Sequence, residues 1–180
     1  RLVEDCPIVT EGVGMLGFIG RRLRVLIIED NQHFRLLLRT VLGSMGVETI
    51  HEAHDGEHAL ALLKDTPVDL LIVDWKMTPL DGLSFVRKLR RDADPVKAAV
   101  PVLMVTGHAD DHLLRQARDS GIDDVLAKPL SAKDLIVRIS GVMSRSVPFI
   151  RCEGYAGPER RRCRDPAFTG LERRRRRNSP

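Results

Sequence analysis

The stretch Leu70-Leu71-Ile72-Val73-Asp74-Trp75 sets four apolar residues directly before one carboxylate. Pro67 precedes this run and Thr78-Pro79 follows it, and a short apolar run bounded in this way is typical of a buried parallel strand. The carboxyl ends of parallel strands form the edge at which open α/β sheets bind their ligands. We therefore expect Asp74 to lie at a binding site and not in the core.

Similar apolar runs recur along the chain and alternate with helical patterns. Each expected strand is followed by a segment in which apolar residues return every three to four positions. This alternation predicts an α/β fold, with a doubly wound, five-stranded parallel sheet covered by helices on both faces. The expected strands are 25–28, 47–51, 70–74, 100–105 and 125–127.

Three other expected strands also end in polar residues. Glu29 and Asp30 follow the first strand, Thr106 follows the fourth, and Lys128 follows the fifth. A parallel sheet gathers these ends at one edge, where three carboxylates repel one another and favour a divalent cation with oxygen ligands, such as Mg²⁺. A carboxylate nucleophile, a metal, a lysine and a hydroxyl donor together suit the acceptance of a phosphoryl group.

In order and spacing these residues resemble the CheY-like receiver domain of a two-component response regulator. The matching segments are Glu29-Asp30, the stretch from Asp74 to Gly82, Val105-Thr106-Gly107 and Lys128-Pro129, and the resemblance covers residues 24–144. It implies a flavodoxin-like fold with the strand order 2-1-3-4-5.

The resemblance also implies roles for the strand-end residues. Asp74 would be the phosphoacceptor, Thr106 the switch hydroxyl and Lys128 the lysine that binds the phosphoryl group, with a cis Lys128-Pro129 bond. Catalysis would be limited to the domain's own phosphorylation and dephosphorylation, so the chain is not expected to be an enzyme. The implied Mg²⁺ ligands are Glu29 (indirectly), Asp30, Asp74 and the backbone carbonyl of Lys76.

Three features depart from the usual pattern of that family. Val125 stands where Tyr or Phe is common, so the switch that pairs the threonine with a swinging aromatic ring cannot operate in its usual form. Thr78-Pro79 stands where Pro commonly occupies the first of the two positions. Lys76 and His108 stand where side chains commonly tune dephosphorylation.

Several other patterns have ordinary explanations. Gly12 to Gly17 match GxGxxG, but no helix follows at once, as a dinucleotide site requires. Met15 is a candidate natural start. The histidines at 51, 54 and 58 lack a second ligand pair and are expected to be ordinary surface residues. Cys6, Cys152 and Cys163 lack the spacing of a zinc site or a disulfide framework, which fits a reducing cytoplasm.

The charge of the chain is unevenly distributed. Residues 145–180 hold 11 of the 29 basic side chains and 4 of the 25 acidic ones, which leaves 18 basic and 21 acidic residues in 1–144. We expect a flexible leader at 1–22, a receiver domain at 23–145 and an Arg-rich, disordered tail at 146–180. Within the tail, the segment from Tyr155 recurs from Phe168 as a second aromatic residue followed by an Arg cluster.

These observations favour a stand-alone, cytoplasmic response regulator. A sensor histidine kinase or a histidine phosphotransfer protein would donate the phosphoryl group, and an unknown protein target would read the phosphorylated surface. Two alternatives stay open: a phosphorelay shuttle that passes the group to a histidine phosphotransfer protein, and a binder of nucleic acid or a membrane surface that uses the Arg-rich tail. No apolar run approaches the length of about 20 residues that spans a bilayer.

Overall fold

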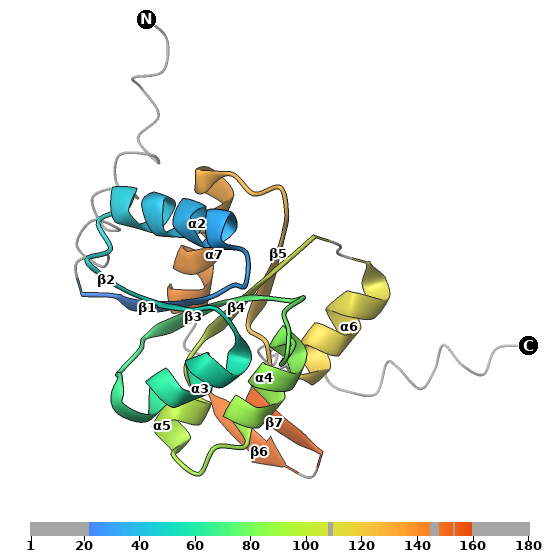
Figure 1. Cartoon of the computed structure of the whole chain (residues 1–180). Helices are drawn as coiled ribbons and strands as arrows, with labels where there is room; N and C mark the ends of the chain where they lie inside the picture. Colours follow the sequence, from blue (N-terminus) through green and yellow to red (C-terminus); the bar gives the residue numbers. More distant parts are fainter. Residues whose placement is uncertain (1–21, 108–109, 145–147, 153, 160–180) are drawn as a thin grey trace, which may run out of the picture.

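The computed structural model describes residues 22–107, 110–144, 148–152 and 154–159. In these ranges five parallel strands form one sheet in the order β2-β1-β3-β4-β5 (Figure 1). This confirms both the fold class and the strand order that the resemblance implies. The strands of this sheet are β1 (Arg24–Ile28), β2 (Thr49–Ala53), β3 (Leu70–Asp74), β4 (Val102–Thr106) and β5 (Asp124–Ala127).

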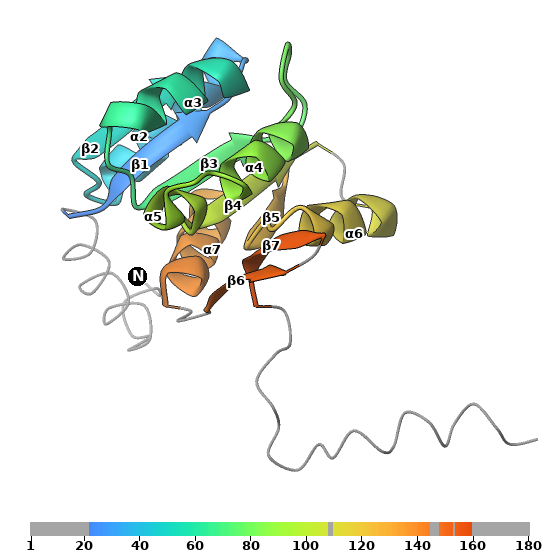
Figure 2. The same cartoon turned by 90° about the horizontal axis from the view of Figure 1, so that it is seen from below.

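The helices divide into two layers. Helices α2 and α7 cover one face of the sheet, and α3, α4 and α6 cover the other, with the short α5 at the end of α4 (Figures 1 and 2). Both faces of β3 and β4 are fully buried, as expected for central parallel strands with near-continuous apolar sequences. The helices are α2 (Gln32–Ser44), α3 (Gly56–Asp65), α4 (Gly82–Arg90), α5 (Pro95–Ala98), α6 (Asp111–Asp119) and α7 (Ala132–Ser144).

Each face of the sheet has its own apolar core. Leu26 and Ile28 of β1 pack toward α3 and α4, whereas Val25 and Ile27 pack toward α2 and α7. Alternate residues of one strand therefore serve opposite cores, because successive side chains of a strand point to opposite faces. This double burial fixes the register of the strand and hence the position of the residues that follow it.

Side-chain caps begin the helices at the carboxyl edge of the sheet. Asn31 accepts hydrogen bonds from the backbone N–H groups of His33 and Phe34, as its place in the sequence predicts. Ser131 and Asp134 form the expected capping box, with the Asp134 N–H donating to Ser131 Oγ at 3.1 Å. The caps fix the short loops between the strand ends and the helices. Asp55, Asp81 and Asp110 cap α3, α4 and α6 in the same manner, and Asp94 caps the short α5, which follows α4 and not a strand.

Gly82, the first residue of α4, lies against the end of β3. A Cβ atom at this position would lie 2.2 Å from the carbonyl oxygen of Asp74. Only glycine permits this approach, since the atom it would meet is backbone that cannot move aside. The start of α4 is therefore held directly beside Asp74.

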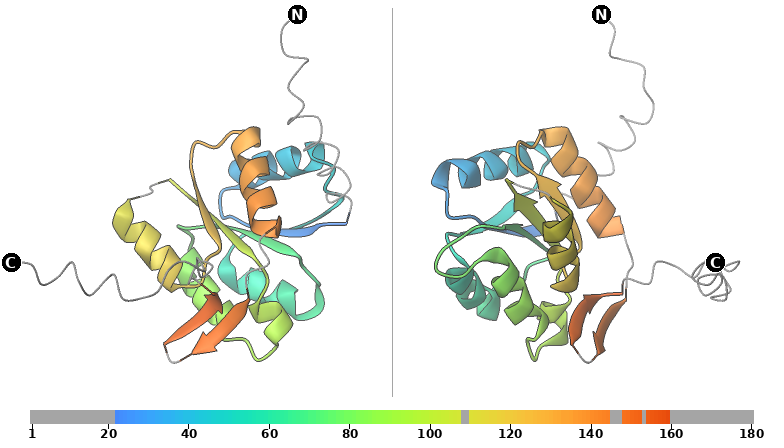
Figure 3. Two further views of the ribbon diagram at one scale, coloured as in Figure 1. Left: turned by 180° about the vertical axis from the view of Figure 1, so that it is seen from behind. Right: turned by 90° about the vertical axis from the view of Figure 1, so that its right-hand side faces the viewer.

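The chain after α7 differs from the expected disordered tail. Residues Phe149–Cys152 (β6) and Tyr155–Pro158 (β7) form an antiparallel hairpin, which lies beside α4 and α6 (Figure 3). The prediction was wrong for these residues because composition alone does not show that Phe149 can pack on a side chain of α4. The leader at 1–21, the Arg cluster at 160–162 and the second aromatic segment from Phe168 lie outside the described residues.

Candidate functional site

The carboxyl ends of β1, β3, β4 and β5 bring the expected polar residues together. Asp74 is the last residue of β3 and pairs in register with Val105, so Thr106 extends one residue further on the neighbouring strand. Thr106 pairs in turn with Ala127, directly before Lys128. The structure therefore places the strand ends as the parallel sheet predicts, and Glu29, Asp74 and Thr106 are all buried.

Lys128 joins two of the buried carboxylates. Its Nζ lies 2.7 Å from Asp74 Oδ1 and 3.0 Å from Glu29 Oε2. The same ammonium group lies 3.9 Å from the centroid of the Phe34 ring on α2, within the range of a cation–π interaction. One cation thus links the ends of β1, β3 and β5 and compensates part of the negative charge between them.

Burial shifts the pKa values of Glu29 and Lys128, and their mutual contacts act against that shift. Desolvation raises the pKa of Glu29 above its usual value, and the hydrogen bond from Lys128 offsets this only in part. Desolvation alone would lower the pKa of Lys128, but hydrogen bonds to Asp74 and Glu29 outweigh it and the pKa of the lysine is raised. Lys128 therefore stays charged, and the carboxylates beside it are its compensation.

The backbone around the acidic residues is also fixed by hydrogen bonds. The Lys76 N–H donates to Asp74 Oδ2 at 3.0 Å, and the Asn31 N–H donates to Glu29 Oε1 at 3.2 Å. Trp75 N–H donates to the Val105 carbonyl at 2.9 Å, which continues the pairing of β3 and β4 past Asp74. The orientation of both buried carboxylates is thus set before any ligand binds.

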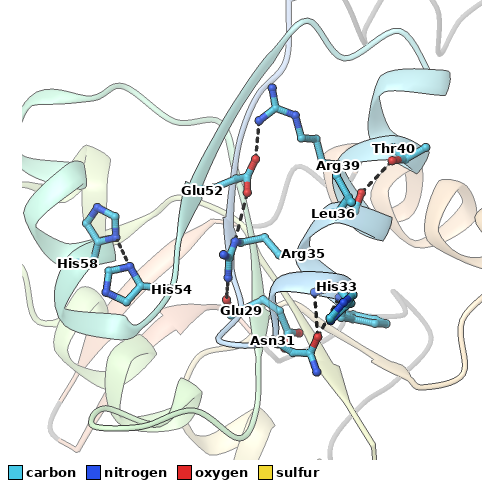
Figure 4. Close-up of polar contacts among 11 residues, drawn as sticks. Glu29, Asn31, His33, Arg35, Leu36, Arg39, Thr40, Glu52, His54 and His58 are labelled. Atoms are coloured by element: carbon cyan, nitrogen blue, oxygen red, sulfur yellow. Dashed lines mark hydrogen bonds and ion pairs between the residues drawn. The ribbon is translucent and has the colours of Figure 1, made fainter.

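Charged residues of α2 and β2, which the sequence did not single out, hold the backbone of Glu29 in place. Arg35 of α2 donates from Nη1 to the Glu29 carbonyl oxygen at 2.6 Å and from Nε to Glu52 of β2 at 3.2 Å (Figure 4). Glu52 also forms an ion pair with Arg39, one turn further along α2. An Arg near the start of the helix after the acidic pair was the available signal, but only the packed fold shows which acceptors it reaches.

The donor set fits a hard divalent cation. Glu29, Asp30 and Asp74 each offer a carboxylate oxygen, and these atoms lie within 4.8 Å of one another. Asp30 is exposed, so the group is reached from solvent, whereas Glu29 and Asp74 are buried. Oxygen-only ligands at an open edge are what Mg²⁺ takes in proteins, because it retains several of its waters. Among the residues that the structure describes, no other group of three such side chains lies this close together.

Other residues singled out in the sequence lie around this edge. Trp75 is partly buried against the apolar core below α3 and α4, and so is Val125. Lys76 is exposed, and His108 lies outside the described residues. The Lys128-Pro129 bond is cis, as the resemblance implies, and the Thr78-Pro79 bond is cis as well.

No histidine or cysteine of the described ranges belongs to the carboxylate cluster. His54 and His58 contact each other through their Nδ1 atoms at 2.9 Å, on the loop before α3 and the first turn of that helix (Figure 4). His51 lies within β2. Cys152 of the hairpin is an exposed free thiol, and the other two cysteines lie outside the described residues.

A parallel α/β sheet whose carboxyl edge joins three carboxylates to a lysine and a buried threonine defines a receiver-type site. A model of the response regulator receiver domain family matches residues 25–140. The chain therefore belongs to that family, whose members are signalling domains of two-component systems that are phosphorylated on an aspartate.

Curated relatives extend this result. The chain is 33% identical over 124 residues to the probable chemotaxis protein CheY of Rhizobium etli, which covers 69% of this chain and 95% of that protein. It is 33% identical over 125 residues to the phosphate regulon transcriptional regulatory protein PhoB of Klebsiella pneumoniae, covering 69% of this chain and 53% of that protein. The chain thus spans nearly all of the CheY relative and about half of the PhoB relative.

Solved structures share the fold. The receiver domain of the histidine kinase CKI1 from Arabidopsis thaliana, in complex with Mg²⁺ and BeF₃⁻, matches with a TM-score of 0.65 and 25% sequence identity. The match covers 74% of this chain and 97% of that domain. In the described part of this chain, none of the helices has the length and apolar composition that a membrane span requires.

Proposed function

We propose that this domain is a molecular switch that accepts a phosphoryl group on Asp74 and changes its affinity for a protein target. The observation that carries the proposal is the Lys128 ammonium group, held 2.7 Å from Asp74 and 3.0 Å from Glu29. A carboxylate can act as a nucleophile toward phosphorus, and the product is an acyl phosphate. The adjacent ammonium group would compensate the negative charge that the phosphoryl group adds.

The remaining residues would support that transfer by position. Glu29, Asp30, Asp74 and the Lys76 carbonyl would hold Mg²⁺, which when bound supplies positive charge to the oxygens of the transferring group. The Lys76 N–H contacts Asp74 Oδ2 and the Lys128 ammonium group contacts Oδ1, so both oxygens of the attacking carboxylate are oriented by fixed donors. Thr106, buried at the end of β4, offers a hydroxyl that would donate to a phosphoryl oxygen.

The phosphoryl group would come from a phosphohistidine. In that step a carboxylate oxygen of Asp74 bonds to phosphorus while the phosphorus–nitrogen bond breaks, and the released imidazole takes up a proton. The donor would be a sensor histidine kinase or a histidine phosphotransfer protein, since receiver domains work with such partners. The downstream target, a stand-alone mode of action and a cytoplasmic location stay predictions.

Two further roles compete with this switch. A phosphorelay shuttle would use the same site but would pass the group on to a second histidine. Binding of nucleic acid or of a membrane surface would instead depend on the Arg-rich segment at 160–177. The first alternative differs from the switch in the fate of the phosphoryl group. The second differs in its target, a polyanion bound by the Arg-rich segment, with the receiver domain as the switch.

Phosphotransfer profiling tests the proposal. Purified histidine kinases and phosphotransfer proteins, labelled on histidine, would be mixed with the full chain in the presence of Mg²⁺. We expect at least one donor to label the wild-type chain and the Asp65→Asn control, whose exposed carboxylate lies at the end of α3, but not Asp74→Asn. Labelled Asp74→Asn would refute the proposal, and rapid return of the label to a phosphotransfer protein would establish the shuttle instead.

A further inference from the structure

The hairpin of β6 and β7 is anchored at the edge of the sheet opposite the phosphorylation site. Its anchor is Arg90, the last residue of α4, which is only 2% exposed. Arg90 donates to the carbonyl oxygens of Ala98 and Val100 at 2.7 Å, which lie just before β4. It also forms an ion pair with Asp123 just before β5, with a separation of 2.9 Å.

The hairpin closes over this buried arginine. The Phe149 ring of β6 lies with its centroid 5.8 Å from the guanidinium carbon of Arg90. Gly121, at the end of α6, has a φ of 84°, and a Cβ there would lie 2.6 Å from the Ala156 carbonyl oxygen of β7. Gly157 of the hairpin approaches Gly121 as closely. These two glycines let the hairpin backbone contact the end of α6. The hairpin therefore packs at a fixed position beside α4 and α6 (Figure 3).

A cavity of about 350 Å³ lies between the hairpin and the ends of α4 and α6. Its size is at the lower end of the range for small-molecule sites, about 300–1,000 Å³. The described residues that line it include four arginines and one aspartate, a net charge of +3 for this set, although residues 1–144 as a whole carry a net negative charge. The arginines are Arg87, Arg90 and Arg91 from α4 and its end, and Arg151 from β6.

Three of the four guanidinium groups have no carboxylate partner among the described residues. Arg90 is the one that is paired. Arg87 donates from Nε to Ser120 Oγ at 3.0 Å, which leaves its two terminal nitrogens to the cavity. Arg151 donates to the Asp92 carbonyl oxygen and stacks beside Phe149. Arg91 is exposed and makes no side-chain hydrogen bond or ion pair with the described residues.

The helix dipole of α4 explains only some of the basic residues around the cavity. Arg87, Lys88 and Arg90 in the last turn of α4 compensate the partial charge of the last carbonyls. Arg151 comes from a separate element, and the hairpin adds it to a lining in which Arg87 and Arg91 also have no carboxylate partner among the described residues. Like charges that line one cavity repel one another. An anion in the cavity would relieve that repulsion, and planar guanidinium groups match the oxygens of phosphate in pairs.

We infer that this cavity binds a small phosphorylated molecule through Arg87, Arg91 and Arg151. The Ser120 hydroxyl and the half-buried ring of Tyr155 lie among the lining residues and add a polar and an aromatic contact. The site is separate from Asp74, because it lies at the amino ends of β4 and β5 and the Asp74 site lies at their carboxyl ends. It requires the hairpin, which lies beyond the matched family region at 25–140.

An NMR titration of the full chain with inorganic pyrophosphate tests this inference. Mg²⁺ is left out and EDTA is added, so that binding at the Asp74 site is suppressed. We expect saturable shifts of the backbone amides of Ser120, Gly154 and Ala156, which border the cavity. Replacing Arg91 and Arg151 together by Gln should weaken the affinity roughly tenfold or more, as expected for the loss of charged hydrogen-bond donors.

The matched control is Arg115→Gln, which removes an exposed arginine of α6 outside the cavity lining. It should leave the affinity unchanged. Shifts confined to the Arg-rich segment at 160–177, or an affinity that Arg115→Gln lowers as much as the double variant, would show general attraction of anions and overturn the inference. Shifts that never saturate would overturn it as well. A response to vesicles with phosphorylated headgroups, without one to pyrophosphate, would replace it with a membrane contact.

Discussion

Lys128 shows how a single residue can decide the electrostatics of a site. Glu29 and Asp74 are both buried, and burying a carboxylate without a compensating cation costs free energy. The lysine contacts both, so one ammonium group compensates two buried carboxylates. Asp30 is exposed and lies outside these ion pairs, so it is the carboxylate that the proposed Mg²⁺ site presents to solvent.

Replacing Asp30 therefore tests the metal site with little effect on the fold. We expect Asp30→Asn to weaken Mg²⁺ binding by roughly tenfold or more, since one anionic ligand oxygen is lost. The readout is the fluorescence of Trp75, the only Trp in the chain, which directly follows Asp74 in the sequence. Glu57→Gln, which removes an exposed carboxylate in the first turn of α3, is the control. Equal Mg²⁺ titration curves for both variants would contradict the proposed ligands.

At the scale of elements, the two edges of the sheet have different tasks. The carboxyl edge carries the proposed phosphorylation site, and the amino edge carries ion pairs that hold strands together. At the amino edge Arg24 of β1 donates from Nε and Nη2 to both carboxylate oxygens of Asp69, which directly precedes β3. The backbone N–H of Arg24 donates to the same carboxylate at 2.9 Å. This arrangement ties β1 and β3 together at their start.

The Asp69 contact should make stability depend on pH. Hydrogen bonds from Arg24 hold the pKa of Asp69 below its usual value. A lowered pKa in the folded state gives stability that is present above the unfolded value of about 3.9 and is lost as pH falls through the folded value. We expect Asp69→Asn to be less stable than wild type at neutral pH, with a difference that shrinks below about pH 4. Urea unfolding across pH measures this.

The control for that experiment is Asp65→Asn, which removes an exposed carboxylate at the end of α3. Its stability should follow the wild-type curve across the same range. A stability difference for Asp69→Asn that persists unchanged at acid pH would mean that shape, and not charge, accounts for the contact.

Helix α4 connects the two edges. Its first residue, Gly82, lies against the Asp74 carbonyl, and its last residue, Arg90, donates to the loops before β4 and β5 and lies beneath the hairpin. Removing this arginine breaks the ion pair with Asp123 and takes a hydrogen-bond donor from the carbonyl groups of Ala98, Val100 and Gly121. The helix should therefore depend on Arg90 more than on any exposed basic residue.

We expect Arg90→Met to lower the free energy of unfolding by about 3–5 kcal/mol, as for the loss of one partner of a buried ion pair. Lys88→Met, an exposed neighbour on the same helix, should change it by less than about 0.5 kcal/mol. Hydrogen exchange adds a second readout, because the amides of β6 and β7 should lose protection in Arg90→Met. Unchanged protection of the hairpin would contradict its anchoring by this residue.

At the scale of the whole molecule, the sheet and the reactive edge could be predicted because both depend on local patterns. Apolar runs predict buried strands, and the residues after Ile28, Val73, Val105 and Ala127 must then meet wherever parallel strands end together. The alternation of apolar runs with helical patterns is enough to predict that these positions meet. No knowledge of side-chain packing is needed, since the backbone alone places these positions.

The support of the site and the hairpin could not be predicted in the same way. Arg35 reaches Glu29 and Glu52 only when α2 lies across β1 and β2, and Arg90 meets its acceptors only when α4, α5 and α6 end side by side. Apolar residues can mislead in the opposite direction. Leu36 and Leu37 would be expected in the core, yet both lie on the exposed side of α2. The prediction of a disordered tail rested on composition, and composition does not show that Phe149 and Gly157 contact the folded domain.

The most direct test of the central claim is to identify the residue that carries the phosphoryl group. The full chain would be incubated with acetyl phosphate and Mg²⁺, the acyl phosphate reduced with borohydride, and the peptides analysed by mass spectrometry. We expect one modified residue, Asp74, no modification in the absence of Mg²⁺, and none in Asp74→Asn. Stoichiometric modification of another residue in the wild-type chain, or of Asp30 or Glu29 in its place, would contradict it.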